Sequence, residues 1–158
     1  MPARNGQSAL PPTDPAALLA GAEAARSRPA ESAAAIARAL REAPGDPEVR
    51  LAAYRFYFYT HDHAAALEQA RVLLVHAARR LNVATDWREV RPGDAAFTEH
   101  AFAPGLYLQA LVAAGYCLAR TGALIEAREI LRKAAELDPS DRFGGGWLCA
   151  RIEAGDDD

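Results

Sequence analysis

Apolar residues recur at intervals of three and four along most of the chain, which is the period of an amphipathic α-helix. The clearest case is the segment 64–81, where Leu67, Ala70, Leu74 and Ala77 fall on one helical face. Clusters of proline, glycine and aspartate interrupt the period at short intervals and mark turns. The pattern therefore predicts an all-α protein built of antiparallel helix pairs.

The periods and breaks predict seven helices. They cover about 14–27, 29–43, 47–60, 64–81, 104–120, 124–136 and 146–154. Residues 1–13 hold several prolines and no apolar period, so we expect a disordered lead-in there. Residues 155–158 form an acidic tail that we expect to be solvated.

One helix pair carries a recognisable motif. Residues 107–140 read YLQALVAAGYCLARTGALIEAREILRKAAELDPS and closely resemble a tetratricopeptide repeat. Gly115 stands where the two helices of that motif touch, and Gly122 makes the turn. Ala127 and Ala134 occupy the small positions of the second helix. In such repeats one pair cannot bury its apolar face alone, so pairs stack.

Two weaker copies precede this repeat. Ser32 and Ala66 occupy the same small position and are 34 residues apart, which is the period of the family. Ala127 follows Ala66 by 61 residues, which corresponds to one period plus an insertion of 27.

The resemblance implies a helical-repeat α-solenoid, with three helix pairs and a C-terminal capping helix in one domain, residues 14–154. The repeats would be 14–46, 47–81 and 104–140, with 82–103 as the insertion and 144–154 as the cap. In the cap, we expect Leu148 and Ile152 to cover the last repeat and Trp147 to pack there too, with stacking of Trp147 on a ligand as the alternative.

In this family the first helices of the pairs line a concave groove that binds a peptide or helix. The run Tyr54–Tyr59 holds five aromatics in six positions, and a helix cannot place them all in one core. Tyrosine and arginine are also frequent in binding hot spots. The mapped groove residues are Leu51, Arg55, Phe58, Tyr59, Val112, Tyr116 and Arg120. Covering of these aromatics by the chain itself is the open alternative.

The insertion 82–103 contains Trp87, Phe97 and Phe102. A loop this long is uncommon in a compact domain, and exposed aromatics favour aggregation. We therefore expect it to be partly ordered and to lie against the groove. A disordered loop whose aromatics themselves bind the partner is the alternative.

Composition narrows the function. The net charge of −3 gives no basic excess, so we expect no nucleic-acid partner. We expect no segment to approach 18 apolar residues without charge, and the first 20 residues show no apolar signal core, so we expect no membrane association and a cytoplasmic location. Cys117 and Cys149 lack a CxxC spacing and are expected to be small buried residues, with a disulfide or metal site as the alternative.

No nucleotide-binding or nucleophile motif occurs in the sequence, so we expect no enzyme activity, no catalytic residue and no cofactor. His61-Asp62-His63 could supply metal ligands, but structural zinc requires four, so a polar turn is preferred.

The leading hypothesis is an adaptor or chaperone-like module that binds another protein. The second is an accessory protein for metalloenzyme or cofactor assembly, of the kind found in nitrogen-fixation gene clusters. The third is a homo-oligomer that self-associates through the aromatic helix.

Overall fold

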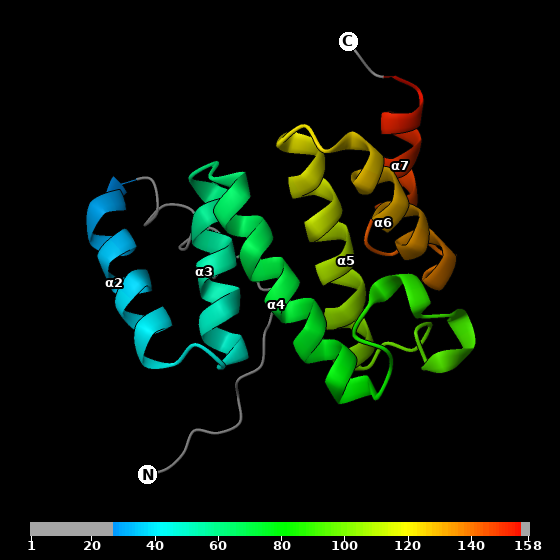
Figure 1. Cartoon of the computed structure of the whole chain (residues 1–158), viewed down its shortest axis with the longest axis horizontal. Coiled ribbons are helices and arrows are strands. Elements are labelled where there is room, and N and C mark those ends of the chain that lie inside the picture. The colour runs from blue at the N-terminus through cyan, green and yellow to red at the C-terminus, as the bar shows by residue number, and fades with distance from the viewer. Residues whose placement is uncertain (1–26, 156–158) are drawn as a thin grey trace. The chain divides into compact units, whose positions relative to one another are not determined.

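The computed structural model describes residues 27–155 of the chain and contains six α-helices in that range (Figure 1). They are α2 (Pro29–Glu42), α3 (Pro47–Tyr59), α4 (His63–Leu81), α5 (Phe102–Arg120), α6 (Leu124–Leu137) and α7 (Gly145–Glu153). Two 3-10 turns, η2 (Trp87–Glu89) and η3 (Pro92–Asp94), lie between α4 and α5. Residues 27–155 include no β-strand, so the all-α prediction is confirmed. The lead-in 1–13 and almost all of the predicted helix 14–27 lie outside the described residues, as do residues 156–158 of the tail.

The helix boundaries follow local sequence signals. Asp46 caps α3, because its side chain accepts a hydrogen bond from the Glu48 amide at 2.9 Å and Pro47 occupies the first helical position. The prediction that the fifth helix starts at Pro104 is wrong by two residues, because α5 begins at Phe102. Proline is tolerated in the first turn, where the amide lacks an intrahelical acceptor anyway.

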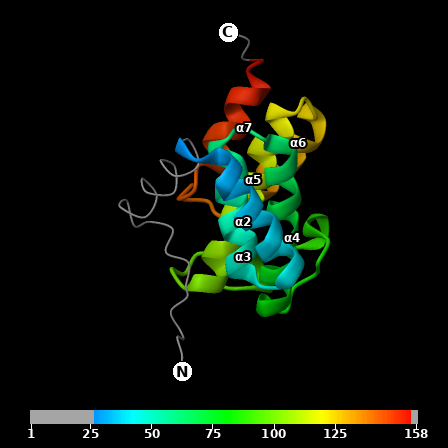
Figure 2. The same cartoon turned by 90° about the vertical axis from the view of Figure 1, so that its left-hand side faces the viewer.

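The chain divides into two compact units, residues 1–69 and 70–158, with the boundary inside α4. In unit 1, α2 and α3 pack side by side (Figure 1), and α2 lies in front of α3 when the unit is viewed from the left-hand side of that picture (Figure 2). Arg50 of α3 links the turn between α2 and α3 to α4. Its Nε donates a hydrogen bond to the Pro44 carbonyl at 2.7 Å, and its Nη1 donates one to Gln69 Oε1 at 2.9 Å. None of the residues of α2 is buried, and α3 buries only Ala53.

Unit 2 contains an extensive core formed by α5, α6 and the part of α4 that belongs to this unit, which buries Ala70, Leu73, Leu74, Ala77 and Ala78. Ten residues of α5 and five of α6 are buried. A Cβ added to Gly115 would lie 2.5 Å from Leu131 Cγ and 3.1 Å from Ile130 Cγ2. The two helices therefore approach too closely for any side chain at that position, which confirms the predicted contact at Gly115.

Helix α7 packs on α6 and α5 through its own glycine. A Cβ on Gly145 would lie 2.9 Å from Ala134 Cβ and 3.1 Å from Val112 Cγ2. The expectation that Trp147 packs inside the cap is wrong, since its side chain is 61% exposed. Gly145 and Cys149 are four residues apart and share the buried face, so the residue at 147 projects to another side of the helix.

Helix α5 also corrects an expectation about membranes. Its 19 residues are long and apolar enough to cross a bilayer by length and composition. The sequence-based statement that no segment approaches that length is therefore wrong. Most of α5 is buried inside the structure, and the core helix of a soluble protein passes the same test.

Candidate partner-binding surfaces

The seven predicted groove residues lie on two helices that belong to different units. Leu51, Arg55, Phe58 and Tyr59 are on α3 in unit 1, and Val112, Tyr116 and Arg120 are on α5 in unit 2.

The α3 surface is dominated by aromatic rings. Tyr54 stacks on Phe58 with ring centroids 5.8 Å apart, and Phe58 meets Tyr59 edge to face at 5.9 Å. Phe56 and Tyr57 form a second edge-to-face pair at 5.4 Å. All five aromatic side chains are half-buried, and so are Leu51 and Arg55. The helix therefore presents aromatic surface that remains partly accessible.

The α5 surface centres on Tyr116 and Arg120. Arg120 Nη1 donates a hydrogen bond to Tyr116 Oη at 3.0 Å, and the guanidinium carbon lies 5.8 Å from the centre of the tyrosine ring. Val112 is half-buried and lies close to Gly145 at the start of α7. The cap thus covers part of Val112, and Tyr116 and Arg120 are the better candidates for partner contacts.

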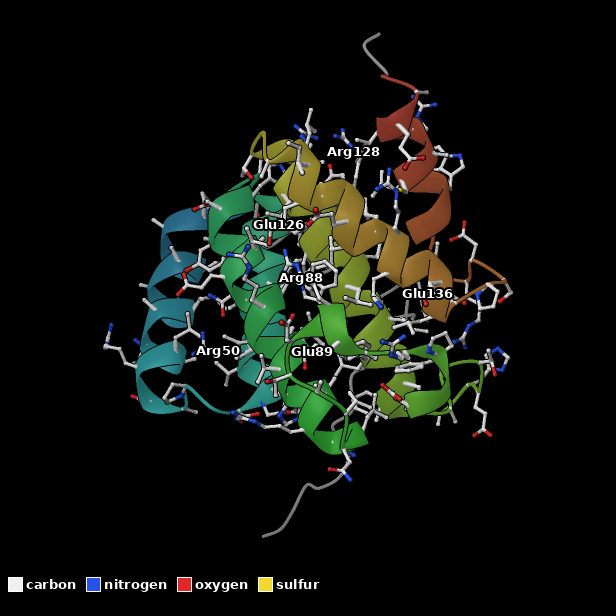
Figure 3. All side chains as sticks on the ribbon, turned by 45° about the vertical axis from the view of Figure 1, so that its right-hand side comes forward. Arg50, Arg88, Glu89, Glu126, Arg128 and Glu136 are labelled. Carbon is white, nitrogen blue, oxygen red and sulfur yellow. The ribbon has the colours of Figure 1, made fainter. Side chains whose placement is uncertain are left out.

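The insertion packs chiefly on α6, the second helix of its pair, and on the loop that follows α6. Lys133 Nζ donates to the Val90 carbonyl at 2.6 Å, and Arg142 Nη2 donates to the Phe97 carbonyl at 2.7 Å. Arg88 approaches Glu129 at 3.5 Å and Glu126 at 4.0 Å (Figure 3). The sequence predicts that the insertion lies against the groove lined by the first helices of the pairs. The residue pattern gives no signal for these hydrogen bonds from cationic side chains to backbone carbonyls.

The three aromatics of the insertion differ in their exposure. Phe97 is fully packed against Tyr107, with ring centroids 5.6 Å apart. Trp87 is half-buried, with the Arg88 guanidinium 4.3 Å from its ring centre. Phe102 is 44% exposed and belongs to the first turn of α5. The expectation that all three are covered is therefore wrong for Phe102.

The two cysteines lie in the interior of unit 2, and two histidine rings lie close together around the start of α4. Cys117 and Cys149 are free and buried, and burial raises the pKa of Cys117 to about 11, so its thiol stays protonated. The rings of His61 and His63 are 6.0 Å apart in the turn before α4. Among residues 27–155, no group of three or more His, Cys, Asp or Glu side chains is placed to hold a metal ion.

The chain is 35% identical over 108 residues to an uncharacterized 19.8 kDa protein in the nifW 5′ region of Azotobacter chroococcum mcd 1. The match covers 67% of this chain and 60% of that protein, so the chain spans less than two thirds of its relative. No protein-family model and no solved structure matches the chain.

Proposed function

We propose that this protein is a non-catalytic, tetratricopeptide-like helical module that binds a peptide, helix or small domain of another protein. The observation that carries the proposal is the aromatic surface of α3. Five aromatic side chains occur on this helix, while Ala53 is the residue that the helix buries completely. Large aromatic side chains that stay partly accessible on a rigid helix are suited to anchoring a partner.

The repeat-like architecture is supported by the close approach at Gly115 and by the burial of three of the four predicted small positions. Ala66, Ala127 and Ala134 are buried, whereas Ser32 is only half-buried. The partner contacts are assigned to Arg55, Phe58 and Tyr59 on α3, with Leu51 beside them, and to Tyr116 and Arg120 on α5, with Val112 at the margin.

Site-specific photo-crosslinking in cells of the source organism tests this function. A photoreactive phenylalanine analogue replaces Tyr59 on α3, and a matched variant carries it at Arg38, an exposed position on α2. We expect one discrete protein adduct from position 59 and none from position 38. Equal labelling at both positions, or no adduct at 59, would contradict the proposal.

A second function is favoured by the relative encoded in the nifW 5′ region. Under this second proposal the protein is an accessory protein that holds a metalloenzyme or one of its assembly factors during maturation. The identity of the crosslinked partner distinguishes the two proposed functions. A metalloprotein or cofactor-assembly factor in the adduct supports the accessory role, whereas a partner unrelated to metals excludes it and leaves the general binding function.

A further inference from the structure

Two helices of unit 2 carry the same pair of residues, an aromatic residue followed four positions later by an arginine. On α5 the pair is Tyr116 and Arg120, and on α7 it is Trp147 and Arg151. The guanidinium carbon lies 5.8 Å from the ring centre in the first pair and 5.2 Å in the second. Because residues four apart are neighbours on a helix surface, each ring supports the arginine beside it.

The two pairs lie near the same end of unit 2. Helices α5 and α7 contact each other and run in the same direction (Figure 1). Gly145 at the start of α7 lies beside Val112 of α5. At a rise of about 1.5 Å per residue, Arg120 lies about 12 Å beyond Val112, and Arg151 lies about 9 Å beyond Gly145.

Neither of these two arginines has a carboxylate partner among the described residues, a property that they share with Arg79, Arg80, Arg91 and Arg128 of unit 2. By contrast, ion pairs with acidic side chains are formed by Arg71, Arg88, Arg132 and Arg142. In each of these four pairs a guanidinium nitrogen lies within 3.5 Å of a carboxylate oxygen. Within residues 27–155, no carboxylate lies within 4.0 Å of Arg120 or Arg151, the limit for an ion pair.

The helices themselves offer no acidic side chain to compensate the two charges. Helix α5 contains no aspartate or glutamate, and Glu153, the acidic residue of α7, pairs with Arg132. Both guanidinium groups are on exposed residues. They therefore keep most of their N–H donors directed to solvent, beside aromatic surface.

We infer that these two pairs, the aromatic–arginine surface, bind carboxylate side chains on an acidic segment of the partner protein. The inference rests on the proposed binding function and names the chemistry of the partner. A guanidinium presents a planar fork of donors that matches a carboxylate, and charge-assisted hydrogen bonds are the stronger ones. Trp147, which is 61% exposed, supplies apolar contact area for the backbone and methylene groups of the same segment.

The test uses the full chain and a displayed library of random 12-residue peptides. Peptides selected on the wild-type protein are synthesised, and their affinities are measured for Arg120→Gln, Arg151→Gln and the matched control Arg79→Gln, an exposed arginine of α4. We expect the selected peptides to be rich in Asp and Glu. Each of the first two variants should weaken binding by roughly tenfold or more, as for a lost charged hydrogen bond, and the control should not.

The outcomes separate this inference from the proposed function. Peptides that bind without acidic enrichment, or whose affinity is insensitive to both arginine variants, overturn the acidic partner but keep the binding function. The absence of any selected peptide counts against the binding function itself. A full-chain variant with Asp156, Asp157 and Asp158 changed to Asn tests the chain's own acidic tail as occupant. If peptides bind tenfold tighter to it, the surface belongs to the tail and the inference is wrong.

Discussion

The two units of this protein use their large side chains in different ways. Among residues 27–155, the largest fully buried side chains, which include Tyr107, Phe97 and Leu131, all belong to unit 2. In the described part of unit 1, Ala53, Ala66 and Gln69 are the buried residues, although α3 is the most aromatic helix of the chain. Aromatic content alone therefore does not produce a core. Unit 2 encloses large side chains in an interior, whereas the aromatic side chains of α3 in unit 1 stay half-buried.

Core truncation gives the sharpest contrast between the units. Leu131→Ala removes a fully buried side chain from unit 2 and is expected to cost about 2–5 kcal/mol of unfolding free energy. Leu40→Ala, at a half-buried position on α2 of unit 1, is expected to cost about 1 kcal/mol or less. Urea titrations followed by circular dichroism measure both. Equal losses would show that unit 1 has a comparable core.

Overpacking should separate the units almost as clearly. Gly115→Leu places a branched side chain where even a Cβ meets Leu131 at 2.5 Å, so we expect about 1–3 kcal/mol of destabilisation. Gly45→Ala in unit 1 is the control, because no atom lies within 4 Å of its added Cβ. The melting temperature should fall for the first variant and stay nearly constant for the second. An unchanged melting temperature for Gly115→Leu would contradict the close packing of α5 on α6.

The buried hydroxyl of Tyr107 is expected to reduce the stability of unit 2. Its hydroxyl is buried and has no hydrogen-bond partner among the described residues. Burial is the main cause that raises the pKa of this hydroxyl, and the nearby charge of Asp86 adds to it. Tyr107→Phe should therefore stabilise the protein by about 1 kcal/mol, because it removes a desolvated polar group without leaving a cavity. Chemical denaturation measures the change. Clear destabilisation would indicate that the hydroxyl has a partner outside the described residues, such as water.

The smallest expected effect concerns the surface ion pair between α6 and α7. The hydrogen bond from Arg132 lowers the pKa of Glu153 below its ordinary value of 4.5. The stabilisation is therefore fully present above pH 4.5 and is lost as the pH falls through the lowered pKa. Glu153→Gln should lower stability near neutral pH by the small amount that an exposed ion pair contributes, and should match the unchanged protein at low pH, where Glu153 is protonated. Melting curves from pH 7 to pH 2.5 on both proteins measure it, and identical pH profiles would contradict the assignment.

The sequence by itself determined the helical class and most helix boundaries, because periodicity, proline positions and caps are local signals. It also indicated Gly115 as a contact and the two cysteines as buried residues. Both predictions rest on the spacing of small and apolar residues along the helices, which is a property of the sequence alone.

Only the tertiary structure decided which large side chains are covered. Trp147 is exposed because Gly145 and Cys149 take the buried face of α7, and Phe102 is exposed because it starts α5 instead of ending the insertion. The support of the insertion by Lys133 and Arg142 was also hidden, because both cations bind backbone carbonyls more than 40 residues away in the sequence. Backbone acceptors occur at every residue, so no pattern of side chains indicates which carbonyl a distant cation will reach.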